Sequence, residues 1–272
     1  MKPNSIDRRE FLRRSAYGLL AAGLWPGAVA AAGDEPDGSF DFIVLNDTHY
    51  KDERCAAYFE AAFGEIRAQA QYDFVLTAGD LATDGRPEEL GPYKELLKLL
   101  GKPSYVVMGN HDHAGDSRQP WIDTFGSDSI NFRFDHKGWT VLGLDSTNGT
   151  RSSGVVVPDE TIAWIGKALR DIPTSRPLVC FTHFPLGNEV TYRLGNADEV
   201  LELFRDHDLK HIFSGHFHGL TERKAGDVGL TTDRCIAFSR GNHDGSKEKG
   251  YFQCHVEDGQ LSYEFVEFRY EA

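Results

Sequence analysis

The run Tyr105–Asp112 constrains this chain more than any other stretch, because an apolar segment ends abruptly in Gly109, Asn110, His111 and Asp112. A short run rich in β-branched residues predicts a buried strand, and a glycine at its end lets the backbone turn sharply. The polar residues would then lie at the carboxyl end of a strand, where open α/β sheets place their ligands. Since asparagine, aspartate and glycine also form ordinary turns, a functional site is predicted only if similar runs occur elsewhere.

The same pattern does occur elsewhere in the chain. Further strand-like apolar runs are found at residues 42–45, 74–77, 178–182 and 211–214. Each is followed closely by side chains that can bind a metal ion or carry a proton, and these are Asp47, His49, Asp80, His183, His216 and His218. Because the carboxyl ends of parallel strands meet at one edge of a sheet, we expect these side chains to lie together.

The segments between these runs have the apolar spacing of helices. Helices are predicted at residues 53–70, 87–100, 159–171 and 197–206. Alternating strands and helices predict an α/β fold with a largely parallel sheet. The tail, at about 219–269, alternates as antiparallel strands and hairpins. No long repeat or linker follows the N-terminal segment, so residues 33–272 are predicted to form one domain.

The first 32 residues differ in character from the rest. Arg8 and Arg9 precede a mildly apolar stretch, 16–32, which Pro26 interrupts. The segment resembles a bacterial twin-arginine export signal, which implies recognition by the twin-arginine translocation machinery and a periplasmic or extracellular protein. A membrane anchor or an amphipathic helix is the alternative, but the run is short for a span of about 20 apolar residues. We therefore expect no stable membrane insertion once the signal is removed.

The charge of the chain excludes one class of partner. The sequence has 42 acidic and 29 basic residues, with a formal net charge of −13. Non-specific nucleic-acid binding requires many lysines and arginines to neutralise phosphates, so nucleic acid is not an expected partner. An anionic substrate would have to be attracted by local positive charge.

The cysteines have no C-x-x-C spacing, so no thiolate metal site is predicted. The four cysteines are Cys55, Cys180, Cys235 and Cys254. A hairpin over residues 234–255 would place Cys235 opposite Cys254, and an exported protein permits a disulfide there. Because the geometry of a cross-strand disulfide is demanding, free thiols are expected and the disulfide is the alternative.

In their order along the chain, the polar runs resemble those of the calcineurin-like metallophosphoesterases. The matching residues are Asp47–His49, Gly79–Asp80, Gly109–Asp112, His183 and Gly215–His218. Asp145, Ser146 and the segment 163–165 are similar to the branch of cyclic-nucleotide and glycerophosphodiester phosphodiesterases. The resemblance covers about residues 40–220. It implies a four-layer α/β/β/α sandwich, in which two mixed β-sheets pack face to face with helices outside.

The chemistry of these residues predicts two metal ions. Carboxylate, imidazole and amide ligands suit divalent or trivalent iron, manganese or zinc, and one carboxylate can bridge two ions. The ligands of one ion would be Asp47, His49, Asp80 and His218. Asp80 would bridge to the second ion, which would be completed by Asn110, His183 and His216. Two such ions would activate a bridging hydroxide for in-line attack on a phosphorus atom.

His111 has no place among these ligands. From the resemblance we expect it to face the oxygen of the leaving group, and Asp112 to orient its ring through a hydrogen bond. Asp84 is expected in a turn or helix cap, and the alternative is that it lines the site. The segment 240–244 has a sequence similar to that of the central run, and a hairpin turn is the expected structure there. The alternative is that His243 or Arg240 borders the substrate pocket. His113 is equally compatible with substrate contact and with simple exposure.

The predicted function is an exported, two-metal phosphodiesterase that acts on a small phosphate ester. A broad phosphomonoesterase is the alternative enzyme, because the core residues are common to both. A catalytically silent metal-binding protein is the alternative outside the enzymes, although silent forms are expected to have lost ligands. Thr83 stands where purple acid phosphatases carry a tyrosine, so no tyrosinate-to-iron colour is expected.

Overall fold

The computed structural model of the chain describes residues 38–270, so the predicted export signal lies outside the described residues. All described residues belong to the second of the two units into which the chain divides, Ala31–Ala272. Within this part of the chain, no helix combines the length and the apolar character needed to cross a membrane.

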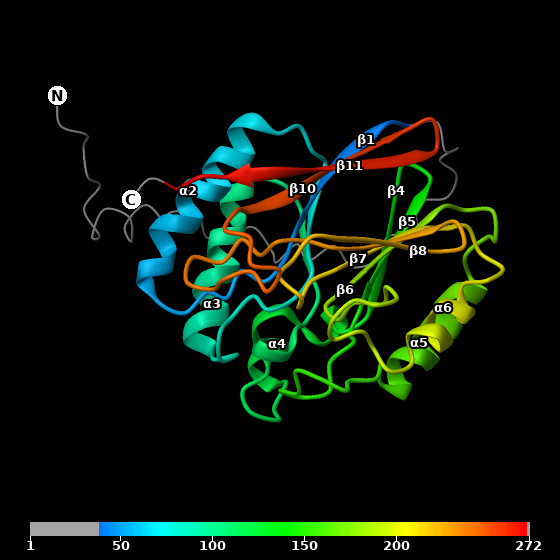
Figure 1. The fold of residues 1–272 in the computed structure, drawn as a ribbon, viewed down its shortest axis with the longest axis horizontal. Helices are drawn as coiled ribbons and strands as arrows, with labels where there is room; N and C mark the ends of the chain where they lie inside the picture. Colours follow the sequence, from blue (N-terminus) through cyan, green and yellow to red (C-terminus); the bar gives the residue numbers. More distant parts are fainter. Residues whose placement is uncertain (1–37, 271–272) are drawn as a thin grey trace, which may run out of the picture. The chain divides into compact units, whose positions relative to one another are not determined.

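Two β-sheets lie at the centre of this unit (Figure 1). The first has the order β11-β10-β1-β2-β3, and the second has the order β4-β5-β6-β7-β9-β8. The strands of the first sheet are β1 (Phe40–Leu45), β2 (Phe74–Thr77), β3 (Ser104–Val106), β10 (Lys249–Glu257) and β11 (Gln260–Phe268). Those of the second are β4 (Phe132–His136), β5 (Trp139–Leu144), β6 (Leu178–Thr182), β7 (Leu209–Ser214), β8 (Thr221–Ala225) and β9 (Val228–Thr232). Both sheets combine parallel and antiparallel pairs.

Helices cover the outer faces of the sheets, which confirms the predicted four-layer architecture (Figure 1). The first sheet is flanked by α2 (Glu53–Gln69) and α3 (Pro87–Leu97), and the second by α5 (Asp159–Arg170) and α6 (Ala197–Leu203). A shorter helix is α4 (Gln119–Phe125), and 3₁₀ turns are η1 (Lys98–Leu100), η2 (Asn110–Asp112) and η3 (Ser127–Ser129). The helix predicted at 87–100 therefore ends as a 3₁₀ turn, which tightens its last residues.

Aromatic side chains fill the space between the two sheets. Phe42 of β1 stacks on Phe74 of β2 with ring centroids 5.1 Å apart. Phe213 of β7 lies edge-on to Phe42 at 6.0 Å and also lies 6.0 Å from Phe252 of β10. Offset and edge-to-face rings at these distances attract each other. The rings therefore hold the first sheet against the second.

Residues 234–255 do not form a hairpin, which excludes the alternative of a disulfide between Cys235 and Cys254. β10 lies between β1 and β11, and Cys254 is opposite Phe42 on one side and Tyr263 on the other. Both hydrogen-bonding edges of β10 are thus used, and none remains for the segment that contains Cys235. All four cysteines are free thiols.

The inter-sheet core predicts the effect of one substitution on stability. Phe213 is 1% exposed, and Phe213→Ala is expected to lower the free energy of unfolding. The loss should be about 3–5 kcal/mol, as for other large-to-small changes in cores, and urea denaturation measures it. Phe238→Ala is the control, because this ring is 43% exposed, and its loss should stay below about 1 kcal/mol. Equal losses would contradict the central role of the inter-sheet rings.

Candidate active site

All the predicted metal ligands lie in one buried cluster where the two sheets meet. Asp47 and His49 follow β1, Asp80 follows β2, and Asn110 follows β3. His183 follows β6, and His216 and His218 follow β7 of the second sheet. Two groups of side chains could each hold a metal ion, and they are Asp47, His49, Asp80 and His218, and Asp80, His183 and His216. Asp80 belongs to both groups, and Asn110 Oδ1 lies 3.1 Å from His183 Nε2.

The backbone of the cluster is unusual. Nine described residues other than glycine have positive φ, and five of them are predicted ligands. These five are Asp47 (φ 50°), His49 (46°), Asp80 (52°), His216 (64°) and His218 (46°). Such conformations cost roughly 1–3 kcal/mol each and concentrate at functional sites. The rest of the fold therefore holds these ligands in place against a local preference.

Two glycines allow the ligand-bearing loops to approach each other. A Cβ on Gly109 would overlap the backbone nitrogen and the carboxylate of Asp80. A Cβ on Gly215 would lie 2.6 Å from Asp47 Oδ2, and real Cβ contacts are not this short. Both positions therefore require glycine because of close approach to a ligand.

Backbone carbonyls orient the rings of three histidines that are predicted ligands. The pairs are His183 Nδ1 to Ala78 O (2.9 Å), His216 Nε2 to Ser152 O (2.8 Å) and His218 Nδ1 to Gly241 O (3.1 Å). Since a carbonyl oxygen only accepts, each of these nitrogens carries a hydrogen. The other nitrogen of each ring is left to face the cluster, an arrangement common to metal-binding histidines. Backbone acceptors such as Ser152 O leave no signal in a sequence.

The nitrogens that face the cluster fit bound cations. His49 Nε2 lies 3.1 Å from His218 Nε2, and His183 Nε2 lies 3.1 Å from His216 Nδ1. Two lone pairs at this distance repel unless a proton or a cation lies between them. Asp47 Oδ1 is buried and lies 3.0 Å from His218 Nε2, the ring nitrogen that faces the cluster. Imidazole and carboxylate together are the donor set of iron, manganese and zinc sites.

The carboxylates hold two of the histidines in their charged form in the metal-free protein. Burial alone would lower the pKa of His183, but Asp80 and Asp47 raise the pKa to about 9. Burial likewise opposes the charged form of His218, but Asp47 raises the pKa of that ring to about 11. Despite complete burial, His183 holds the pKa of Asp80 well below its ordinary value. A metal ion must therefore displace protons from this cluster.

His111 lies beside the ligands without joining them. Its Nδ1 donates to Thr83 O at 2.7 Å, and its backbone N–H donates to Asp80 Oδ1 at 2.8 Å. The His111 ring is edge-on to His49, with centroids 4.9 Å apart. Since Nδ1 carries the hydrogen, Nε2 is the nitrogen that remains for chemistry.

The predicted hydrogen bond between Asp112 and the His111 ring is wrong. Asp112 accepts hydrogen bonds from Ala82 N and Gly109 N, both at 2.8 Å. In the 3₁₀ turn η2, successive side chains point in different directions, so Asp112 turns back toward the loop after β2. It joins the loops after β2 and β3, while Thr83 O orients His111.

The segment 240–244 is not the predicted hairpin turn. It lies against the ligand His218, whose Nδ1 donates to Gly241 O. The His243 ring is parallel to the His218 ring, with centroids 4.7 Å apart, and its backbone N–H donates to His218 O at 2.9 Å. The segment 240–244, whose sequence is similar to that of the central run, therefore forms a second loop beside the ligand cluster.

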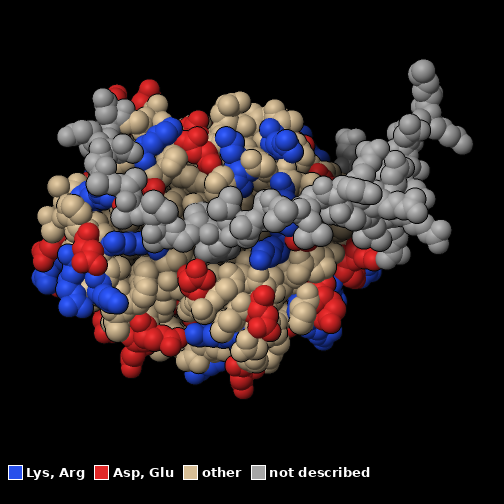
Figure 2. All heavy atoms as spheres, turned by 180° about the vertical axis from the view of Figure 1, so that it is seen from behind, with Lys and Arg blue, Asp and Glu red and all other residues tan. Residues whose placement is uncertain are grey.

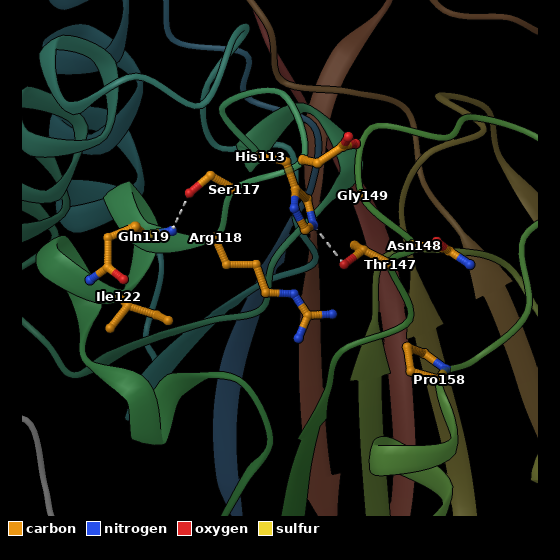
Figure 3. Close-up of a pocket in the computed structure, with 10 residues that line it drawn as sticks. His113, Ser117, Arg118, Gln119, Ile122, Thr147, Asn148, Gly149 and Pro158 are labelled. Atoms are coloured by element: carbon orange, nitrogen blue, oxygen red, sulfur yellow. Dashed lines mark hydrogen bonds between the residues drawn. The ribbon is translucent and has the colours of Figure 1, made fainter.

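Two cavities share His113, and one of them is also lined by the predicted ligand Asn110. One has a volume of about 500 Å³ and is lined by Asp84, Arg86, Asn110 and His111 among others. The other, of about 660 Å³, contains Arg118 (Figure 3). Asp84 lies at the 500 Å³ cavity, where its carboxylate is 3.5 Å from Arg86. The carboxylate of Glu89 accepts a hydrogen bond from the backbone N–H of Asp84.

A series of polar contacts runs from His113 through Thr147 and Asp145 to Arg118, which lines the second cavity. His113 Nε2 lies 2.8 Å from Thr147 Oγ1 (Figure 3), and this hydroxyl donates to Asp145 Oδ1 at 2.6 Å. Arg118 Nη2 lies 2.8 Å from Asp145 Oδ2. Burial lowers the pKa of His113 to about 4, so the ring is neutral and donates to Thr147. His113 is therefore neither exposed nor freely mobile, and the sequence contained no signal for Arg118 or Thr147.

Comparison with known proteins agrees with this geometry. A family model described as calcineurin-like phosphoesterase matches residues 40–220. The chain belongs to this family.

A protein of Enterobacter lignolyticus named glycerophosphodiester phosphodiesterase is 29% identical over 197 residues, which cover 65% of this chain and 70% of that protein. A protein of Rhodopseudomonas palustris named probable cyclic nucleotide phosphodiesterase is 29% identical over 195 residues, which cover 65% and 71%. The fold is similar to that of a purple acid phosphatase from yellow lupin, with a TM-score of 0.64 at 12% identity. That match covers 84% of this chain and 52%, about half, of the lupin protein.

This calcineurin-like phosphoesterase is a metal-dependent phosphoric ester hydrolase, because family, fold and buried ligand cluster agree. Thr83 occupies the position at which purple acid phosphatases carry a tyrosine. Its hydroxyl donates to His49 O at 3.0 Å, while its carbonyl accepts from His111. The absence of tyrosinate colour stays a prediction.

The close approach at Gly109 predicts a specific loss of metal binding in this phosphoesterase. In Gly109→Ala, the added methyl group would displace Asp80, and affinity for the metal should fall by about 10- to 100-fold. Titration of the metal-free protein with Co²⁺ measures this. The control is Gly91→Ala in α3, where a Cβ meets no atom within 4 Å. It should leave metal affinity unchanged and raise the free energy of unfolding by up to about 1 kcal/mol. Unchanged affinity in Gly109→Ala would contradict the steric argument.

Metal binding is expected to release about two protons per chain at pH 7, because ligand nitrogens must be free of protons. The protons come from His183 and His218, whose pKa values lie above 7. Burial lowers the pKa of His49 to about 3 and that of His216 to about 4, so these rings release none. Affinity should therefore rise with pH, and for the group with His183 it should level off near pH 9. Calorimetry in buffers of different ionisation enthalpy counts the protons, and a count near zero would contradict the charged histidines.

Proposed function

We propose that the protein is an exported phosphodiesterase that uses two metal ions. The observation that carries this proposal is the position of Asp80, which belongs to both groups of buried ligands. One ion would be held by Asp47, His49, Asp80 and His218, and the other by Asp80, Asn110, His183 and His216. Bound ions of this type act as Lewis acids and make water acidic enough to be a nucleophile at neutral pH.

His111 is suited to protonate the leaving group. Thr83 O accepts the Nδ1 hydrogen at 2.7 Å, which fixes the orientation of the ring. Nε2 can then hold a proton and give it to the departing alcohol oxygen. The side chain is half-buried beside the 500 Å³ cavity, so it can meet a substrate without displacing a ligand.

A phosphodiester fits the surroundings better than a phosphomonoester. Cavities on the His111 side and beyond His113 leave room for organic groups attached to the phosphate. The arginines that line them already face carboxylates, Arg86 with Asp84 and Arg118 with Asp145. A monoester carries an additional negative charge near neutral pH, and these paired arginines offer it little compensation. The names of the two curated relatives also support a diester.

The alternatives have less support. A phosphomonoesterase would share the metal cluster, but no contact in the described part of the chain favours a terminal phosphate. A silent metal-binding protein would not need His111, whose ring is nevertheless held by a hydrogen bond beside the ligands. Nucleic acid remains an unexpected partner. On the face shown in Figure 2, basic side chains are interspersed with acidic ones.

Export through the twin-arginine machinery rests on the sequence of residues 1–32 alone. Fractionation of bacteria that make the full chain tests it, with Arg8→Lys/Arg9→Lys as the matched variant. Accumulation outside the cytoplasm in the wild type alone would support export by this route, and equal distribution would contradict it.

The first test of the activity is metal content per chain, measured together with hydrolysis of a bis-ester and a mono-ester of p-nitrophenol. Two metals and faster bis-ester hydrolysis are expected. Faster mono-ester hydrolysis would replace the proposal with the phosphomonoesterase, and failure to bind metal after reconstitution would overturn it.

Two substitutions separate the predicted roles. His111→Ala should retain both metals and lose turnover by about 100- to 10,000-fold, as expected for a general acid. Asp80→Ala should lose metal, because both groups of ligands share this carboxylate. The measurements are metal content and kcat on the bis-ester. If both variants lose metal to the same extent, the division of roles is wrong.

A further inference from the structure

Tyr192 is a large aromatic side chain that remains exposed beside the ligand cluster. Its ring is edge-on to that of the ligand His216, with centroids 4.8 Å apart. The ring of His243 lies 5.9 Å away and is also exposed. His243 in turn stacks on the ligand His218 at 4.7 Å. Two exposed rings therefore flank the cluster next to two of its ligands.

The loop that carries Tyr192 holds it in an unfavourable backbone conformation. Tyr192 has φ 67°, which is uncommon for a bulky residue. Hydrogen bonds that close the loop are Leu194 N to Pro185 O (2.9 Å), Arg193 Nε to Leu186 O (2.9 Å) and Arg223 Nε to Asn188 O (3.1 Å). Arg193 also lies 2.6 Å from Asp198 of α6. The loop thus keeps the ring in place although neither burial nor local backbone preference requires it.

Tyr192 and His111 contact different ligands. The His111 ring lies against His49, which belongs to the first group, and the Tyr192 ring lies against His216, which belongs to the second. A phosphodiester has one alcohol that leaves and one that is retained. Since His111 is suited to the leaving oxygen, the retained alcohol is the group that can reach Tyr192.

We propose that Tyr192, together with His243, forms a stacking site for a flat ring on the retained alcohol of the substrate. The inference rests on the proposed phosphodiesterase function and names the substrate class as diesters whose retained group is an aryl ring or nucleobase. Rings attract each other in offset or edge-to-face contact, which an alkyl group cannot reproduce. Aromatic faces also attract quaternary ammonium groups, but bound metal ions beside His216 and His218 would repel such a cation.

The test uses two substrates that share one leaving group. Phenyl p-nitrophenyl phosphate and methyl p-nitrophenyl phosphate both release p-nitrophenol and differ in the retained alcohol. Tyr192→Leu should lower kcat/KM for the phenyl diester by about 3- to 10-fold and change the methyl diester by less than about 2-fold. Tyr192→Phe should retain the preference, because it keeps the ring. Metal content should equal that of the wild type in both variants.

Glu189→Leu is the matched control, because Glu189 lies in the same loop with φ 62° and receives the same new side chain. It should leave the ratio of the two kcat/KM values unchanged. Equal losses on both diesters in Tyr192→Leu would show that Tyr192 only positions His216. An unchanged ratio, or a loss in Tyr192→Phe as large as in Tyr192→Leu, would also overturn the stacking site.

Binding separates this inference from the proposed function. Calorimetry on His111→Ala, with and without Tyr192→Leu, gives the Kd of each diester without appreciable turnover. A phenyl preference in Kd that Tyr192→Leu removes supports the stacking site, and no such preference overturns it. If the wild type binds metal and hydrolyses neither diester, the proposed function fails, while the ratio of Kd values still decides the inference.

Discussion

The shared carboxylate of Asp80 is the contact on which the site depends. It lies 3.3 Å from His183 of the second sheet and 3.6 Å from His49 of the first, and it accepts the backbone N–H of His111. A buried carboxylate is stable only where positive charge and hydrogen-bond donors surround it. The two sheets must therefore hold their positions closely for these opposite charges to meet. The aromatic core between the sheets supplies that rigidity.

The aromatic core stabilises the folded state, whereas the ligand cluster destabilises it. Rings such as Phe42, Phe74 and Phe213 lie buried between the sheets and favour the folded state. The ligand turns oppose it, because five ligands have left-handed backbone and because buried charged groups are taken from water. Such backbone conformations persist only where contacts with the surrounding structure hold them in place. Bound metal would favour the folded state further, since the ligand cluster does not exist in the unfolded chain.

The site also separates metal binding from substrate recognition. Ligands follow directly from strand ends, so their positions are rigid. Residues that line the cavities, among them Arg118 and Thr147, belong to the intervening loops, and Tyr192 lies in another loop beside His216. Loops of this kind can vary without disturbing the residues at the strand ends.

The sequence by itself determined the strand and helix order of residues 40–220 and pointed to the side chains that form the buried cluster, because both follow from local patterns. Apolar runs predict strands, and glycine with polar residues at their ends predicts a site. Contacts between segments that are distant along the chain left no comparable pattern in the sequence. The pairing of β10 with β1 and β11, which separates Cys254 from Cys235, was decided by the tertiary structure. So were the bond from His111 to Thr83 O and the position of Tyr192 beside His216, because backbone acceptors and ring contacts depend on how loops meet in space.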